Sequence, residues 1–126
     1  MTDDAVALAR ASYDAYVAKD RAAIEALISD DFHFTSPLDN RINRATYFAR
    51  CWPNSETIVS FDFIHLVADG NRVYVTYEGL AKDRRFRNTE LLRVENGRIT
   101  DAEVYFGWSI PHPAPPGSSL ENGLAE

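Results

Sequence analysis

The amino-acid sequence predicts an α+β domain, a cone-shaped barrel in which a curved antiparallel sheet wraps over three N-terminal helices. Two observations lead to this fold class. Helical periodicity is confined to the chain up to about residue 52, and alternating patterns rich in β-branched and aromatic residues follow from residue 57 onward. Two hairpin signals, Asp69-Gly70-Asn71 and Asn96-Gly97, then join the alternating segments to one another.

Three segments are expected to form the helices. In residues 3–18, apolar positions recur at helical spacing and give one buried face: Val6, Ala9, Tyr13, Tyr16 and Val17. Asp20 is expected to cap a second, short helix at 21–28, because its carboxylate can accept hydrogen bonds from free backbone amides. A third helix is expected at 45–52, and the following Pro53 is expected to end it. This short helix carries several bulky side chains.

Alternation with period two indicates the strands. They are expected at 32–36, 57–68, 73–77, 86–94 and 99–108. Pro37 ends the first of them, because proline cannot donate a hydrogen bond to a strand ladder. Asp39-Asn40-Arg41 is interpreted as a turn or loop, and residues 79–85 as a polar connection between two strands.

We expect residues 1–110 to form one domain and residues 111–126 to form a Pro-rich tail that is extended or disordered. The net charge of −6, without a basic cluster, argues against nucleic acid and acidic membranes as partners. The N-terminus lacks a basic and apolar signal segment, and no apolar run approaches the roughly 18 residues of a membrane span, so we expect a cytoplasmic protein. Cys51 is the only cysteine, which excludes an intramolecular disulfide.

The strand expected at 86–94 has the most informative pattern. Alternation places five side chains on one face: Phe86, Asn88, Glu90, Leu92 and Val94. An amide and a carboxyl thus interrupt an apolar face, and burying a carboxyl costs several kcal/mol unless it is paired or its pKa shifts. Two interpretations remain open: Glu90 marks a polar spot inside an apolar pocket, or it reaches water at a sheet edge or at the mouth of the barrel.

Motifs for metal, phosphate and nucleophilic chemistry are missing from the sequence. It has no cysteine pair, no His-x-x-x-His, no Gly-rich phosphate loop and no Gly-x-Ser-x-Gly elbow, so we expect no metal and no cofactor. His33, His65 and His112 are interpreted as hydrogen-bonded or surface histidines, and Cys51 as a small packed side chain. Aromatic residues occur in every predicted element, enough to pack a core and to line a pocket for a small apolar or aromatic molecule.

Several groups of residues carry a family resemblance. They lie at 13–20 followed by 24–31, at Ser36-Pro37, at 89–99 and at 103–106. Through them the sequence resembles the nuclear transport factor 2-like superfamily over roughly residues 3–110, and most of all its SnoaL-like and ketosteroid-isomerase-like members. The resemblance implies a cone-shaped barrel that pairs as a homodimer through the outer face of its sheet. On that face strand parity places Arg87, Thr89, Leu91 and Tyr105.

The resemblance also implies roles for single residues. In ketosteroid isomerases a protonated carboxylic acid on this strand donates to the developing enolate oxygen, and Glu90 falls at its position. The general-base Asp of those enzymes corresponds to Ser36, so that base is missing here. Their oxyanion Tyr falls one residue before Tyr13, and the aromatic residue that lines the pocket on the last strand falls at Phe106. Relatives with a carboxylate on the last strand have it near Val104.

Together the pattern and the resemblance predict a ligand pocket with Glu90 as the candidate catalytic residue. The predicted lining is Tyr13, Tyr16, Ser36, Phe48, Trp52, Tyr77, Asn88, Glu90, Val104 and Phe106. Two kinds of function fit: an isomerase, cyclase or dehydratase using acid–base chemistry on a small apolar carbonyl compound, or a non-catalytic ligand-binding or dimerisation module. Asp39 and Asp62 are further candidates for a base.

Overall fold

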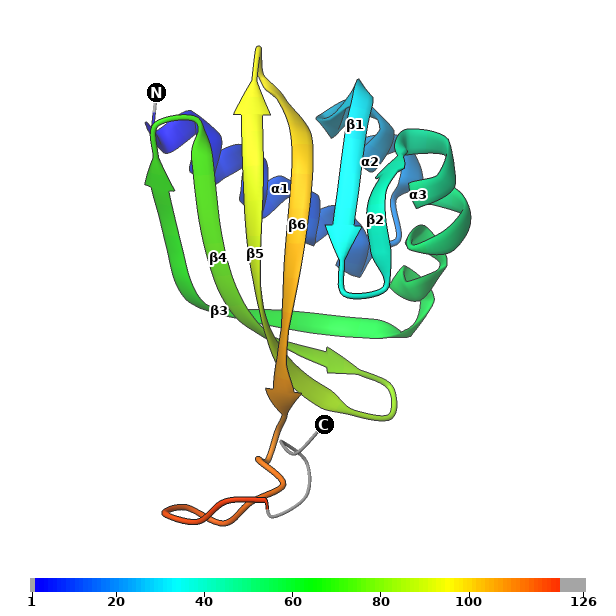
Figure 1. The fold of residues 1–126 in the computed structure, drawn as a ribbon. Coiled ribbons are helices and arrows are strands. Elements are labelled where there is room, and N and C mark those ends of the chain that lie inside the picture. Colours follow the sequence, from blue (N-terminus) through cyan, green and yellow to red (C-terminus); the bar gives the residue numbers. More distant parts are fainter. Residues whose placement is uncertain (1, 121–126) are drawn as a thin grey trace.

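The computed structural model describes residues 2–120, which form three α-helices, one 3-10 helix and six strands (Figure 1). The helices are α1 (Thr2–Ala18), α2 (Arg21–Leu27) and α3 (Arg44–Arg50), and the 3-10 helix is η1 (Trp52–Thr57). The strands are β1 (Ile28–Ser36), β2 (Asp39–Asn43), β3 (Ile58–Asp69), β4 (Arg72–Ala81), β5 (Arg85–Glu95) and β6 (Arg98–Ser109). The predicted α+β class, with a curved sheet over N-terminal helices, is confirmed.

Local sequence determines where the short helices begin and end. Asp20 caps α2 as predicted, since its side chain accepts a hydrogen bond from a first-turn backbone amide at 3.1 Å. Asn43 caps α3 in the same way at 2.9 Å. The third helix ends at Arg50, earlier than the predicted residue 52, and Pro53 lies in the 3-10 helix that follows. Proline has no backbone N–H, so it cannot continue the α-helical hydrogen bonds at that point.

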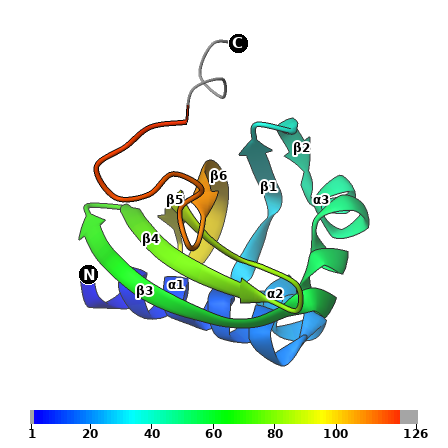
Figure 2. The same cartoon turned by 90° about the horizontal axis from the view of Figure 1, so that it is seen from below.

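The strands form one sheet in the order β2-β1-β6-β5-β4-β3. Its neighbouring strands are antiparallel, except that β1 runs parallel to β6. The sheet is strongly bent but not closed, since in residues 2–120 the edge strands β2 and β3 do not pair with each other. Figure 2 shows β3 and β4 curving along α1, while β1 and β2 stand at the opposite side of the hollow.

Two predicted connections are different in the structure. The interpretation of Asp39-Asn40-Arg41 as a turn is wrong, because Pro37 and Leu38 form the turn and residues 39–43 pair with β1 as strand β2. The polar connection predicted at 79–85 is reduced to residues 82–84. Residues 79–81 belong to β4, because Gly79 and Leu80 pair with Phe86 and Arg85 at the start of β5.

The core lies between α1 and the concave face of the sheet. Helix α1 contributes Ala5, Ala9 and Tyr13, helix α2 contributes Ile24, and the sheet contributes Val73, Val75 and Leu92. The pairing register shifts between Phe63 and His65 in β3, and between Phe86 and Asn88 in β5. Such irregularities bend a strand and increase its twist, which allows the long strands to curve around the helix.

The residues after β6 have no regular secondary structure as far as residue 120. Ala114 is buried, and the His112 ring lies 5.9 Å from the Trp108 ring of β6 between centroids, so the first residues of the predicted tail contact the end of β6. The remainder of the predicted tail, residues 121–126, lies outside the described residues. Within residues 2–120, no helix is long and apolar enough to cross a membrane.

Candidate functional site

A cavity of about 650 Å³ lies on the concave side of the sheet. Apolar side chains make up most of its wall: Ile24, Ile28, Phe32, Phe34, Phe61, Leu92, Ile99, Ala102 and Val104. Two further lining residues, Leu38 and Phe106, are 75% and 53% exposed, so the mouth of the cavity lies near the ends of β1 and β6. The volume and the apolar wall are typical of small-molecule sites in proteins.

Glu90 is the carboxyl group of this cavity. Its neighbours across the sheet are Val75 on β4 and Val104 on β6, so apolar side chains flank it on both sides. The Tyr13 hydroxyl donates a hydrogen bond to Glu90 Oε1 at 3.0 Å, and the Tyr77 hydroxyl donates to Oε2 at 2.6 Å. Both carboxyl oxygens therefore have a neutral donor, one from helix α1 and one from strand β4.

A second layer of contacts holds the two tyrosines in place. Asn88 Nδ2 donates to the Tyr77 hydroxyl at 3.4 Å, and the backbone N–H of Gly107 donates to Asn88 Oδ1 at 3.2 Å. The Tyr13 ring packs against Phe61 at 5.1 Å between ring centroids, and Phe61 lies 5.0 Å from the Tyr77 ring. Edge-to-face packing of this kind fixes ring orientation, so the hydroxyl donors are held toward Glu90.

Burial changes the protonation of this group of residues. Loss of solvation raises the pKa of Glu90 above its ordinary value, although the hydrogen bonds from Tyr77 and Tyr13 act in the opposite direction. Burial also raises the pKa of Tyr13 and of Tyr77, and the negative charge of Glu90 adds to both effects. The tyrosines thus remain neutral donors, while the proton of Glu90 is held more tightly than that of a solvated carboxyl.

A second polar pair lies in the wall, and sequence reasoning missed half of it. The hydroxyls of Tyr16 and Tyr47 form a short hydrogen bond between α1 and α3, and both residues line the cavity. Tyr47 is one of the bulky side chains of the helix predicted at 45–52. Helical spacing alone does not tell which of these side chains faces the cavity. Cys51 lines the cavity nearby, and burial raises the pKa of its thiol to about 11, so it remains protonated.

Most of the predicted pocket residues lie around this cavity. Those that line it are Tyr13, Tyr16, Tyr77, Asn88, Glu90, Val104 and Phe106. Ser36, Phe48 and Trp52 are not in its wall. The Ser36 hydroxyl instead donates to Asp39 Oδ2 at 2.9 Å beside the β1–β2 turn. Phe48 lies under the guanidinium of Arg21, and Trp52 packs edge-on against the Tyr16 ring from outside the lining.

The additional bases considered from sequence lie away from Glu90. Asp39 accepts hydrogen bonds from Ser36 and from Arg50, the latter at 3.0 Å, and Asp62 is exposed. Neither residue lines the cavity, and nor does a histidine. Among the lining residues that the structure describes, Glu90 is the only carboxyl group. The same part of the chain contains no group of three His, Cys, Asp or Glu residues arranged to hold a metal ion.

The fold is that of nuclear transport factor 2-like proteins. The sequence pattern of the SnoaL-like domain matches residues 9–102, and the chain belongs to that family. No curated protein matches the sequence.

Solved structures share the fold at low sequence identity. A candidate ketosteroid isomerase from Kribbella flavida is 22% identical, with a TM-score of 0.72 over 95% of this chain and 90% of that one. An epoxide hydrolase of the LEH-like type from M. tuberculosis is 21% identical, with a TM-score of 0.69 over 84% and 80%. A candidate SnoaL-like polyketide cyclase from Jannaschia sp. is 11% identical, with a TM-score of 0.71 over 82% and 85%. Likeness at this identity shows the fold alone.

Replacing Glu90 by Gln is expected to change how stability depends on pH. Because the folded-state pKa of Glu90 is raised above 4.5, the unfolded state loses this proton first as the pH rises. Between 4.5 and the folded-state pKa, the wild type therefore loses up to about 1.4 kcal/mol of unfolding free energy per pH unit. A Glu90→Gln variant lacks this loss, so its stability relative to the wild type should increase with pH across that interval.

Urea denaturation of both proteins from about pH 4 to pH 8 measures the difference. A Glu95→Gln variant, which removes an exposed carboxylate from the end of β5, is the matched control. Parallel profiles for the Glu90→Gln variant and the wild type would contradict the assignment of a raised pKa.

Proposed function

We propose that this protein binds a small, largely apolar molecule in its cavity, with a neutral polar group of that molecule against Glu90. One observation carries the proposal: a single carboxyl, hydrogen-bonded by Tyr13 and Tyr77, lies in a mostly apolar wall. An apolar body removes the wall from water, and a carbonyl or hydroxyl oxygen supplies the partner that the Glu90 proton needs. The cavity volume of about 650 Å³ suits a molecule of drug-like size.

A neutral apolar probe tests binding in this cavity. Phenylnaphthylamine, whose fluorescence increases in an apolar environment, should bind the wild type. A Val104→Phe variant should bind it about tenfold more weakly or worse, since an added ring in a filled space costs about 1–3 kcal/mol. Val104 is buried and lines the cavity, so the added ring would occupy the space that the bound phenylnaphthylamine needs.

A Val17→Phe variant is the control, because it makes the same change at a side chain on α1 that is 37% exposed and lies outside the cavity lining. It should bind the probe as the wild type does. Circular dichroism verifies that both variants fold. Equal probe affinity in the Val104→Phe variant and the wild type would show that the probe does not occupy this cavity, and the binding proposal would fail.

Acid catalysis is a second candidate, and the raised pKa of Glu90 favours it. A carboxyl that keeps its proton can donate it to a carbonyl oxygen as negative charge develops there. The described lining holds no second carboxyl and no imidazole, so the other proton transfer would fall to water or to the substrate itself. Isomerisation, cyclisation and dehydration of a carbonyl compound all need such a donor.

Turnover separates catalysis from binding. In a screen of small cyclic ketones and hydroxyketones, a compound that the wild type converts should be converted about a hundredfold more slowly, or not at all, by Glu90→Gln. Cys51→Ser, which changes another lining residue, should keep most of the activity. Equal turnover by Glu90→Gln would remove acid catalysis from consideration and leave the binding proposal standing.

The protein also pairs as a homodimer through the outer face of the sheet, the convex side opposite the cavity. Pairing register aligns Val67 with Tyr74 and Tyr74 with Leu91 across three strands, and Tyr105 lies beside Thr89. Val67, Tyr74 and Tyr105 are 56%, 40% and 56% exposed. A run of exposed apolar and aromatic side chains on a sheet face supports a protein interface.

Sedimentation velocity at micromolar concentration tests the dimer. The wild type should sediment as a dimer, and Tyr74→Arg as a monomer, because the new charge would be desolvated in the interface. Val17→Arg, the same kind of change at an exposed position on α1, should leave the dimer intact. A monomeric wild type would contradict the proposal.

A further inference from the structure

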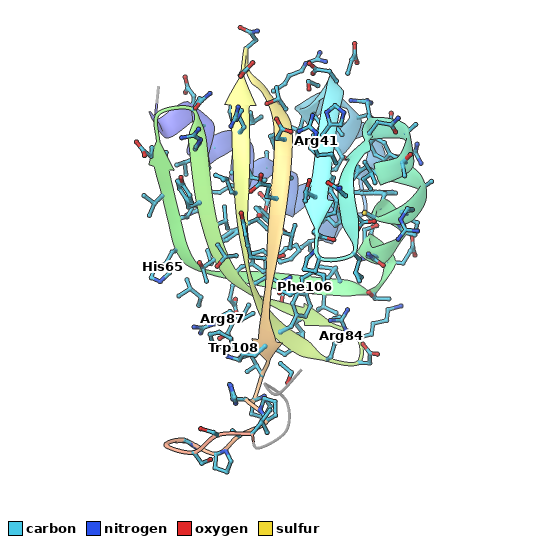
Figure 3. The ribbon with its side chains drawn as sticks, in the orientation of Figure 1. Arg41, His65, Arg84, Arg87, Phe106 and Trp108 are labelled. Atoms are coloured by element: carbon cyan, nitrogen blue, oxygen red, sulfur yellow. The ribbon has the colours of Figure 1, made fainter. Side chains whose placement is uncertain are left out.

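The mouth of the cavity carries positive charge in a protein that is otherwise acidic. The chain has a net charge of −6, yet residues 82–87, Lys-Asp-Arg-Arg-Phe-Arg, contain four basic residues and one acidic residue. This segment is the connection from β4 to β5 together with the first residues of β5. Two of its arginines, Arg84 and Arg85, line the cavity. Figure 3 shows Arg84 near the lower end of β6, on the same side of that strand as Phe106.

The nearby carboxylates neutralise these two arginines only weakly. Glu78 forms its short ion pair, at 2.6 Å, with Arg87, and its other oxygen lies 3.9 Å from Arg85. Asp83 is 83% exposed and lies 4.0 Å from the Arg84 guanidinium, at the limit of an ion pair. Exposed pairs with such distances contribute little. Neither Glu78 nor Asp83 lines the cavity, so the described lining includes two arginines and a single acidic residue.

Packing holds Arg84 at this position. Its guanidinium lies over the Phe86 ring, 4.8 Å from the ring centroid, and Phe86 also lines the cavity. The Arg84 side chain remains 62% exposed, so its donors are accessible to a ligand. Arginine presents a planar fork of donors that matches the two oxygens of a carboxylate, and stacking on an aromatic ring limits how far the fork can move.

The charged groups of the cavity lie at separate positions along β5. Glu90 lies five positions after Arg85, which corresponds to about 17 Å along an extended antiparallel strand. A negative group near Glu90 would lose solvation and be repelled by that carboxyl whenever it ionises. A negative group at the mouth would instead lie beside two arginine residues, Arg84 and Arg85, while remaining partly in water.

From this arrangement we infer that the ligand is an amphipathic organic anion. Its carboxylate or sulfonate lies at the mouth against Arg84 and Arg85, its apolar body fills the cavity, and a neutral oxygen reaches Glu90. The inference rests on the proposed binding function and adds the charge and the orientation of the ligand. Cations of similar shape are disfavoured by the same two arginines.

Two probes with the same ring system test the inference. Anilinonaphthalene sulfonate carries a negative charge, and phenylnaphthylamine is its neutral counterpart. The wild type should bind the sulfonate more tightly, and each probe should displace the other if they share the cavity. In Arg84→Gln, affinity for the sulfonate should fall about fivefold, as expected for a partly exposed charge pair, while affinity for the neutral probe stays unchanged. Salt should weaken sulfonate binding only, because the Debye length shrinks from about 30 Å at 0.01 M to about 8 Å at 0.15 M.

An Arg72→Gln variant is the matched control. It removes one exposed positive charge from the β3–β4 hairpin, outside the cavity lining, so it tests for an effect of net charge alone. The inference fails if Arg84→Gln leaves the preference for the sulfonate unchanged, or if Arg72→Gln reduces it equally. In that case neutral-probe binding still supports the proposed function. If neither probe binds the wild type, the proposed function fails and this inference fails with it.

Discussion

The central constraint in this structure is the placement of a carboxyl group in an apolar wall. Desolvation of Glu90 would cost several kcal/mol if its oxygens had no partners. The hydroxyls of Tyr13 and Tyr77 provide those partners, and the same desolvation keeps the tyrosines protonated. Because one tyrosine is on α1 and the other on β4, satisfying one carboxyl ties the first helix to the centre of the sheet.

The hydrogen bonds from Tyr13 and Tyr77 to Glu90 determine the position of the cavity as well as that of α1. Tyr13 packs against Phe61 and Phe63, so α1 lies along β3 and beside the bend of the sheet rather than filling its whole concave face. The remaining space opens toward the far ends of β1 and β6, where Leu38 and Phe106 are exposed. The carboxyl of Glu90 thus lies in the interior, and the apolar lining of the cavity extends from it toward the mouth. In most proteins the carboxylate is at the surface and the apolar side chains lie beneath it.

Sequence reasoning found the polar centre of the site more successfully than its boundaries. Period-two alternation is strict along a strand, so it placed Asn88 and Glu90 on the inner face without knowledge of the neighbours. Helical spacing could not separate Tyr47, which lines the cavity, from Phe48, which packs under Arg21, because adjacent bulky residues on a short helix all fall near one side. Strand β2 was missed because its Asp and Asn residues favour turns, and only pairing with β1 makes them a strand.

The chemistry of Glu90 limits what the cavity can do with a bound molecule. A raised pKa means that, at a given pH, more of Glu90 keeps its proton and is available as a donor and less of it is carboxylate, whereas the two tyrosine donors favour the carboxylate. A complete acid–base cycle needs a second group to take a proton, and the described lining provides no carboxylate or imidazole for it. A molecule that reacts here must therefore carry its own proton acceptor or use water. A molecule that only binds needs no such acceptor, because the apolar lining and the Glu90 carboxyl are enough to hold it.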